Sequence, residues 1–377
     1  MRMKPTTSRN AKPPAAGPPR PAAWRTAVGQ DPAARRILES WRRLTTGPRE
    51  RRAGPGGPTL IACSGGADSS ALVLALAVAQ SPATSICVAH ILHDLRPRRE
   101  ALADREAARK LAKLVGARFL TAQVRIRDAR GNPEANARSA RYCALLKLAH
   151  RHKLSFIATA HHADDQLETL LMALMRGSGP RGLRGVAIRR RLDPGPAATR
   201  TSPTFLIRPM VDAHTTRDDS ERICRAAGWE WAVDATNADE SRLRSAVRHQ
   251  IVPLMRALRP AAPRHAVETA RTMHLAASLL QSRARTIFKL GEVHSRSATW
   301  PRARLIPHPP PLLGEFLRLA AEHFSAAKGA DRMAARAIAP ITRAIRDSST
   351  EPRRFEIGPI RVEVTARVVT IAPRRSR

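Results

Sequence analysis

The sequence predicts an α/β protein: a parallel sheet with its helices, then a helical region and a short β-containing tail. Three observations predict this class. Between residues 58 and 214, short apolar runs alternate with helical patterns, which is typical of βαβ units and a parallel sheet. From residue 215 to residue 348 the apolar periodicity is mostly helical. Within residues 349–377, apolar residues are spaced as in a β-hairpin or meander.

Residues 1–57 are expected to form a basic, disordered arm with one short helix. Residues 1–30 contain no acidic residue and two Pro-Pro pairs, which interrupt a continuous helix. A transit peptide would also be Arg-rich and free of acids, but the prolines disfavour the amphipathic helix that it needs. Residues 32–44 can form the short helix, because Asp31 can cap it and Pro32 suits its first turn.

The other elements follow from apolar periodicity. Strands are expected at residues 59–63, 85–92, 118–124, 155–160 and 204–209. Helices between them are expected at residues 69–80, 98–115, 134–152 and 164–176. Beyond the sheet, helices are expected at residues 216–228, 240–258, 262–290, 310–326 and 331–346. The strands of the tail should contain Phe355, Ile357, Ile360, Val362, Val364 and Val368.

The charge of the chain indicates a polyanionic partner. Its 377 residues include 66 Lys and Arg against 31 Asp and Glu, a net charge of +35. Nucleic acid and anionic lipid both fit this excess, and a GC-rich genome would also enrich Arg, Ala and Pro. Aromatic residues make up only 3% of the chain, so a nucleic acid would be contacted through phosphates and shape rather than stacking.

Two classes of protein are disfavoured. No run of about 18 apolar residues exists, so the sequence predicts no membrane span. The four cysteines form no Cys-x-x-Cys pair, which argues against a disulfide scaffold and a zinc ribbon. We therefore expect a reducing, cytoplasmic compartment.

A glycine-rich loop lies between the first expected strand and the first expected helix. At such a position free N–H groups of the helix favour an anion. Gly65 and Gly66 permit close backbone approach, and Asp68 would suit a Mg²⁺ ion that bridges phosphates. An ordinary capped helix start is the alternative, and the loop lacks the Gly-Lys-Ser/Thr of a Walker A motif. The loop reads Ser64-Gly65-Gly66-Ala67-Asp68-Ser69.

This hexapeptide resembles the PP-loop of the ATP pyrophosphatase superfamily. The resemblance implies an adenine nucleotide alpha hydrolase-like fold and an enzyme that splits ATP between the α and β phosphates. Three further blocks are similar to one family, the tRNA(Ile)-lysidine synthases. They are His90–Arg96, with Asp94 where Gly is usual, Glu134–Tyr142, and His161–Leu183, which contains His161-His162-Ala163-Asp164-Asp165-Gln166-Leu167-Glu168-Thr169.

The similarity continues beyond the expected sheet. Arg208-Pro209-Met210 and Asp234-Ala235-Thr236-Asn237 match family segments, and Arg217 lies where the family begins its next helix. The segment from Arg244 to Pro253 also matches, except that Ser245 replaces an Asn. In total the resemblance covers roughly residues 58–258, so the N-terminal arm and the tail lie outside it.

The resemblance implies a defined reaction. ATP would adenylate the C2 oxygen of the wobble cytidine in an isoleucine tRNA with a CAU anticodon, and L-lysine would then displace AMP to give lysidine. Residues 64–69 would hold ATP with Mg²⁺ at Asp68, which counts with His161 and His162 as a candidate catalytic residue. Residues 58–214 would be the catalytic domain and residues 215–348 the tRNA-binding domain; a homodimer is an open alternative.

Acidic side chains suit the lysine substrate, and basic side chains suit the phosphates of tRNA and ATP. Asp165 and Glu168 lie three residues apart on one expected helix face, so they can converge on the lysine cation, and Asp164 and Glu168, four apart, could do so as well. An acidic stripe at a helix start is the alternative. Arginines with their planar forks suit tRNA or ATP phosphates, although each alone could be a solvated surface charge. The candidates are Arg138, Arg141, Arg176, Arg244 and Arg248.

Other functions fit less well. A PP-loop tRNA thiolase, the leading alternative, needs reactive thiols. Cys63 and Cys87 are expected inside strands, while Cys143 and Cys224 lie far apart on expected helices. An enzyme that amidates small molecules would not explain the charge of the chain. An RNA-binding protein with an inactive loop would not need the acidic residues that the sequence retains.

Overall fold

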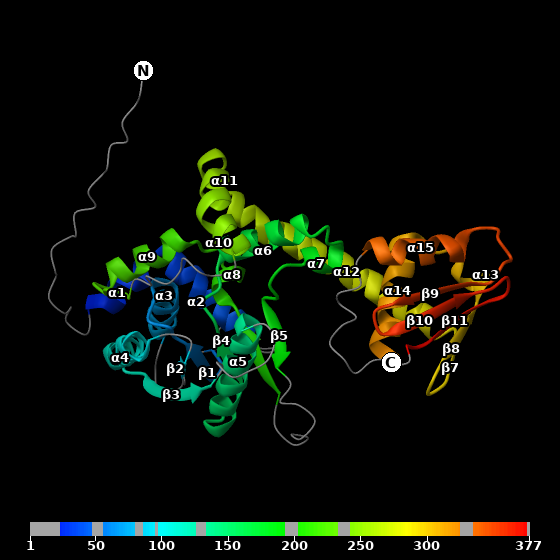
Figure 1. Ribbon diagram of the computed structural model, residues 1–377. Helices are drawn as coiled ribbons and strands as arrows, with labels where there is room; N and C mark the ends of the chain where they lie inside the picture. Colours follow the sequence, from blue (N-terminus) through cyan, green and yellow to red (C-terminus); the bar gives the residue numbers. More distant parts are fainter. Residues whose placement is uncertain are drawn as a thin grey trace. The chain divides into compact units, whose positions relative to one another are not determined.

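The structure of the chain is a computed structural model that forms two compact units (Figure 1). It describes residues 23–46, 56–79, 86–94, 97–125, 133–192, 203–232, 242–324 and 335–374. Unit 1 consists of Met1–Asp164 and Ala187–Asp239, and unit 2 of Asp165–Val186 and Glu240–Arg377. These units interleave in sequence, whereas we expected a catalytic segment that ends at residue 214 and a helical segment that starts at residue 215.

Unit 1 is built on a six-stranded sheet in the order β3-β2-β1-β4-β6-β5. Five strands are parallel, as expected: β1 (Thr59–Ala62), β2 (Ile86–His93), β3 (Arg118–Val124), β4 (Phe156–Ala158) and β6 (Thr204–Ile207). The edge strand β5 (Arg189–Leu192) is antiparallel to β6 and was not predicted. Its sequence, Arg-Arg-Arg-Leu, has no apolar alternation, and charged side chains are common on edge strands.

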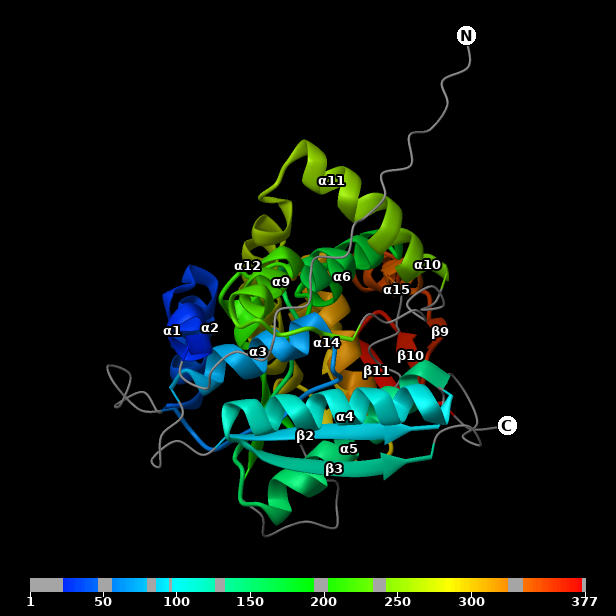
Figure 2. The ribbon, with the colours of Figure 1, turned by 90° about the vertical axis from the view of Figure 1, so that its left-hand side faces the viewer.

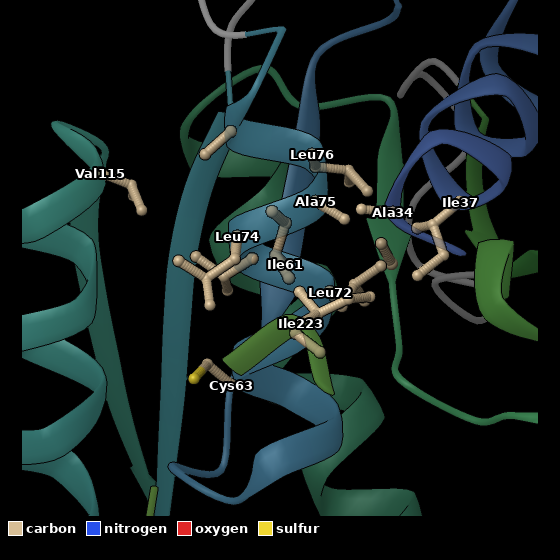
Figure 3. Packing of buried hydrophobic residues seen from close by; sticks show 14 of the residues in the cluster. Ala34, Ile37, Ile61, Cys63, Leu72, Leu74, Ala75, Leu76, Val115 and Ile223 are labelled. Carbon is tan, nitrogen blue, oxygen red and sulfur yellow. The ribbon is translucent and has the colours of Figure 1, made fainter. Parts of the chain in front are cut away.

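Helices cover both faces of this sheet. On one face lie α2 (Pro32–Thr45), α3 (Ala67–Ala77), α4 (Arg98–Val115) and α9 (Arg217–Ala226). Their buried side chains, among them Ile37, Leu72 and Ile223, pack with Ile61 of β1 (Figure 3). Helix α4 runs along β2 and β3 (Figure 2). On the other face, α5 (Pro133–Arg151) packs Leu145 and Ala149 against the strands. The short α8 (Pro209–Asp212) follows β6.

The expectation of a disordered arm up to residue 30 is wrong for residues 23–30. They form α1 (Ala23–Gln30), whose Trp24 and Val28 are buried in the core of unit 1. These two residues lie four apart, so one face of a short helix is apolar and joins α2 and α3. The prolines that argue against a helix all precede residue 22. Asp31 caps α2 as expected, because its Oδ1 accepts from Ala33 N and Ala34 N.

Unit 2 contains most of α6 (Ala163–Met175), since the division falls after Asp164. Its other helices are α7 (Pro180–Leu183), α12 (Ala262–Phe288), α13 (Arg302–Leu305), α14 (Pro310–Phe324) and α15 (Ala335–Arg346). The single helix expected at 240–258 is interrupted: α10 (Arg242–Ala246) and α11 (Val252–Leu258) flank the π-helix η2 (Val247–Ile251). Within unit 2, Leu167 and Leu170 of α6 pack with Val247 and Ala266.

The tail strands belong to a five-stranded antiparallel sheet in the order β7-β8-β11-β10-β9. Strands β9 (Arg353–Ile357), β10 (Ile360–Val364) and β11 (Val368–Pro373) were expected as a meander. Strands β7 (Glu292–Val293) and β8 (Ala298–Pro301) come from the region expected to be helical. Trp300 of β8 is fully buried with Phe316 and the tail residue Ile371, so the tail shares one core with the helices.

Candidate functional site

The loop at residues 64–69 has the geometry of an anion site. The loop follows β1, and α3 begins at Ala67. Its N-cap is Gly66, which has no side chain that could cap the N–H groups of the first turn. Ser64 N donates to Ser69 Oγ at 3.1 Å, and Ser69 Oγ donates to Gly66 O at 3.0 Å, which folds the loop back on itself. Free N–H groups of the first turn of α3 are therefore available to a phosphate.

Gly65 is required by both conformation and space. Its φ of +94° lies in a region that side chains with a Cβ rarely adopt. A Cβ there would also stand 3.2 Å from the carbonyl oxygen of Asp104 on α4. The loop therefore depends on a glycine at this position, as the sequence suggested.

Asp68 lies at the centre of a charged cluster in unit 1. Arg217 NH1 donates to its Oδ2 at 2.7 Å, and His162 Nε2 lies 3.6 Å from its Oδ1. His162 Nδ1 is 3.3 Å from Asp164 Oδ2, which also accepts from the backbone N of Arg217 at 2.9 Å. Burial alone would raise the pKa of Asp68, but the charges of His162 and Arg217 outweigh it and hold the pKa below its ordinary value.

This cluster fits a cation that is held mainly by phosphates and water. Asp68 Oδ1 is buried and has no hydrogen-bond partner among the residues that the structure describes. Within the same described ranges, no group of three His, Cys, Asp or Glu side chains could hold a metal by itself. Mg²⁺ in nucleotide sites is commonly bound by one or two carboxylates plus substrate phosphates, so Asp68 suits this ion and not a protein-only metal cage.

Asp165 and Glu168 come together in unit 2, as their spacing predicted. The Glu168 side chain is 3% exposed and pairs with two arginines. Arg248 Nε donates to Glu168 Oε1 at 2.8 Å, and Arg244 Nε donates to Oε2 at 3.2 Å. Asp165 Oδ1 lies 3.5 Å from Arg248 NH2 and 3.7 Å from Arg244 NH2. The two carboxylates that we expected to hold a lysine are thus held by two arginines that we expected to contact tRNA.

The local helix geometry explains this pairing. Arg244 and Arg248 are four residues apart, so a helix brings them to one face. Arg248 lies in η2, and single-turn π segments often occur at functional sites. Sequence periodicity did not reveal the pairing because Glu168 and Arg248 lie 80 residues apart.

The remaining candidates are spread over other elements. His161 Nδ1 is hydrogen-bonded to Thr159 Oγ1 at 3.0 Å. Arg138 and Arg141 are exposed on α5, and Arg176 is exposed just after α6. The motif residues Leu95, Arg96 and Asp234–Asn237 lie outside the described residues, as does the side chain of Glu134.

Two residues were not expected at the Asp68 cluster: Arg217 was not a candidate, and Asp164 was an alternative partner of Glu168 for the lysine. Arg217 begins α9, and Asp164 is the second residue of α6, so both meet Asp68 or His162 only in the folded chain. The resemblance drew attention to the position of Arg217, but no local pattern linked it to a carboxylate 149 residues away.

The buried cysteines are poor nucleophiles. Burial raises the pKa of the Cys63 thiol, and burial together with the charge of Asp68 raises the pKa of Cys224 to about 12. The pKa of Cys87 is raised by burial as well. Since thiolates are the reactive form, none of these three thiols suits sulfur transfer.

Among the described segments of the chain, no helix has the length and apolar character needed to cross a membrane.

Comparison with known proteins places this site in a family. A model of the PP-loop domain matches residues 50–255. The tRNA(Ile)-lysidine synthase of Salinispora tropica is 38% identical over 236 residues, which cover 61% of this chain and 66% of that protein. The tRNA(Ile)-lysidine synthase of Bordetella pertussis is 36% identical over 231 residues, which cover 59% of this chain and 68% of that protein. The matched part thus spans about two thirds of these relatives.

A solved structure supports the fold. The U34-tRNA thiolase NcsA from Methanococcus maripaludis, with its [4Fe-4S] cluster, superposes with a TM-score of 0.50 at 15% identity over 64% of this chain and 78% of that one. At this identity the likeness concerns the fold alone. The PP-loop domain model and the sequence relatives show that the chain belongs to the tRNA(Ile)-lysidine synthase family of PP-loop proteins.

Proposed function

We propose that the chain ligates L-lysine to C2 of the wobble cytidine of an isoleucine tRNA with a CAU anticodon. ATP first adenylates the C2 oxygen, and the lysine amine then displaces AMP to form lysidine. The observation that carries this proposal is the Asp68 carboxylate, with its buried Oδ1, beside an intact phosphate loop in a member of this family. An inactive loop in an RNA-binding protein would have no need of such a carboxylate.

ATP would lie with its phosphates on the loop at residues 64–69. The N–H groups at the start of α3 and the hydroxyl of Ser64 face an anion there. Asp68 would hold Mg²⁺ through Oδ1, while its Oδ2 is kept in place by Arg217. When bound, Mg²⁺ neutralises phosphate charge and so favours departure of diphosphate.

Lysine would bind at Asp165 and Glu168. In this group two guanidinium groups, those of Arg244 and Arg248, already lie against the two carboxylates. A lysine ammonium would therefore compete with a guanidinium group for the same carboxylate oxygens. A carboxylate that already holds two guanidinium groups in a site 3% exposed is built to bind cations, which suits this substrate.

The attacking amine must lose a proton, and a histidine can accept it. His161 and His162 are the candidates. His162 contacts both Asp68 and Asp164, so its ring is fixed by carboxylates on either nitrogen. His161 is oriented by Thr159 instead.

The tRNA would be held by phosphate contacts. The described residues between 215 and 348 are mostly helical and this segment is basic, so we assign it to the RNA. Arg138, Arg141 and Arg176 are exposed and suited to phosphate, and Arg244 or Arg248 becomes suited to it once lysine releases a guanidinium group. A tRNA substrate places the reaction in the cytoplasm.

The test is a product assay with the full chain. Purified protein is incubated with ATP, lysine and a CAU-anticodon isoleucine tRNA, and mass spectrometry should show one lysine added at the wobble cytidine. Asp68→Asn should abolish the product, whereas Glu230→Gln, a matched change of an exposed carboxylate in unit 1, should not. Absence of product with the intact chain, or product in Asp68→Asn at the wild-type rate, would overturn the proposal.

A further inference from the structure

Three arginines gather around the single tyrosine of the chain at one edge of the unit 1 sheet. The guanidinium groups of Arg138 and Arg190 lie 5.6 Å and 5.2 Å from the ring centroid of Tyr142. Arg208, which is 2% exposed, lies beneath them and is hydrogen-bonded to Tyr142 and to Ala187 O. Arg138 and Arg190 themselves are exposed.

The fold explains why these residues meet. Tyr142 is one helical turn beyond Arg138 on α5, so both lie on one face of that helix. In β5, Arg190 pairs with Leu206 and faces the same side of the sheet as α5, whereas Arg189 faces the opposite side and stacks on Phe205 at 4.3 Å. The arginines therefore come from three separate elements that converge on one ring.

Among the described residues, no carboxylate compensates the positive charge of this group. Within the described part of the chain, Arg138, Arg190 and Arg208 take part in no salt bridge. The Nε of Arg208 is buried without a hydrogen-bond partner there. Burial, together with the like charges of Arg138 and Arg190, lowers the pKa of Arg208 to about 10. Cation–π contacts at exposed sites contribute only about 0.5–1 kcal/mol each, so an anion is needed to balance the cluster.

We propose that Arg138, Arg190, Arg208 and Tyr142 form a binding site for a phosphodiester group of the RNA substrate. The site rests on the proposed function and deepens it, because it places part of the RNA on unit 1. Arg138 and Arg190 supply forked donors to the phosphate oxygens, and Arg208 with Tyr142 supports them from below. From the sequence, Arg138 was a candidate for phosphate contact, and so was Arg208, which lies in a segment that matches the family; Arg190 was not.

The geometry favours RNA over the phosphates of ATP. Strand β5 is three positions away from β1 in the sheet, which corresponds to about 14 Å from the strand that precedes the phosphate loop. The neighbouring Arg141 is close enough to the loop for its charge to act on His90, whose ring is bonded to Cys63 O beside the loop. A polymeric substrate extends beyond the nucleotide site, and a phosphate group at this distance belongs to the polymer.

The experiment measures RNA affinity across a salt series with the full chain and the CAU-anticodon isoleucine tRNA. The double variant Arg138→Gln/Arg190→Gln should bind the tRNA about tenfold more weakly at low salt. The slope of log affinity against log salt should become shallower by about 0.7–1 for the lost phosphate. Affinity for ATP alone, and for inorganic phosphate as a probe of the loop, should stay within twofold of the wild type.

Arg189→Gln is the matched control, because it removes one equal charge from the same strand on the opposite face. The proposal is overturned if Arg190→Gln weakens tRNA binding no more than Arg189→Gln, or if the double variant loses ATP affinity instead. Arg190→Lys keeps the charge without the fork and should recover only part of the affinity.

The outcome is separable from the proposed function. If the double variant binds the tRNA more weakly but the wild type forms no lysidine, the proposed reaction is contradicted and the phosphate site is supported. Formation of lysidine by wild type, with unchanged tRNA affinity in the double variant, would contradict the phosphate site alone.

Discussion

Neighbouring residues of α6 take part in two carboxylate clusters of different character. Asp164 belongs to the cluster with Asp68, His162 and Arg217, in which the buried Asp68 Oδ1 has no hydrogen-bond partner among the described residues. Asp165 belongs to the cluster with Glu168, in which two arginines balance two carboxylates.

The difference teaches how each cluster can take a cation. Successive side chains on a helix point about 100° apart, so two adjacent aspartates can serve separate sites. The first cluster keeps a carboxylate oxygen that accepts no hydrogen bond from the described residues, so Mg²⁺ could bind there with the loss of only the 3.6 Å ion pair with His162. The second already holds two guanidinium groups against its two carboxylates, so lysine would compete with an arginine. Three variants test this contrast, and Asp31 serves as a structural reference.

The largest effect is expected for Asp68→Asn. The amide keeps the size of the side chain but removes the charge that would face Mg²⁺, so ATP-dependent release of diphosphate should fall by about 100-fold or more. A coupled diphosphate assay with Glu230→Gln as the control measures it. A loss of less than tenfold would mean that the oxygen is not an ion site.

Glu168→Gln should have the next largest effect. It leaves Arg244 and Arg248 without their shared carboxylate and removes one ligand of the lysine cation. The KM for lysine should rise by about 10- to 100-fold, while the KM for ATP stays near that of the wild type. Equal increases in both constants would show that the variant disturbs the whole protein and not the lysine subsite.

Arg248→Gln tests whether lysine replaces a guanidinium group. Its expected effect on lysine affinity is smaller than that of Glu168→Gln and opposite in sign. Removal of one guanidinium takes away a cation that competes for Asp165 and Glu168, so lysine should bind roughly three- to tenfold more tightly in the absence of tRNA. Calorimetry on the chain without tRNA separates this effect from any phosphate contact of the same arginine. Weaker lysine binding in this variant would contradict exchange.

Asp31 provides a purely structural reference with the smallest effect on activity. It caps α2 and pairs with Arg222 at 2.8 Å. Asp31→Ala should lower the free energy of unfolding by about 1 kcal/mol through the lost cap, without changing the product assay.

Asp31→Asn keeps a capping oxygen and removes the charge, so it separates the two roles. Burial raises the pKa of Asp31, but its bonds to Arg222 and to the N–H groups of Ala34 and Ala33 outweigh this, so the folded-state pKa lies below the ordinary value. Its electrostatic contribution is therefore present above about pH 4 and is lost as the pH falls. Thermal unfolding from pH 7 to pH 3 should show a smaller loss of stability in Asp31→Asn than in the wild type.

The parallel sheet and the phosphate loop could be predicted because their signals are local. The apolar runs of β1 to β4 and β6 and the Gly-Gly-x-Asp-Ser loop lie within short windows of sequence. Strand β5 was not predicted because it is an edge strand with three arginines and no apolar alternation. Helix α1 was not predicted because its two buried apolar residues are a weak pattern. Strands β7 and β8 were not predicted because pairing makes them strands and not local preference: β8 pairs with β11, and β7 pairs with β8.

In the candidate site, too, local spacing could be predicted from the sequence, whereas contacts between distant segments could not. Asp165 and Glu168 were predicted to converge because three residues on a helix fix their spacing. Their partners Arg244 and Arg248, like Arg217 at Asp68, come from elements that only the fold brings near. The charge of +35 indicated an RNA partner, but only the pairing of individual arginines distinguishes those engaged with carboxylates from those, such as Arg138 and Arg190, that carry uncompensated charge.

The most direct test is mass spectrometry of the anticodon fragment after reaction with isotopically labelled lysine. We expect the label on the wobble cytidine with the wild-type chain, dependent on ATP, and no label with Asp68→Asn. Label in the absence of ATP, label in Asp68→Asn at the wild-type level, or no label with the wild-type chain would contradict the account.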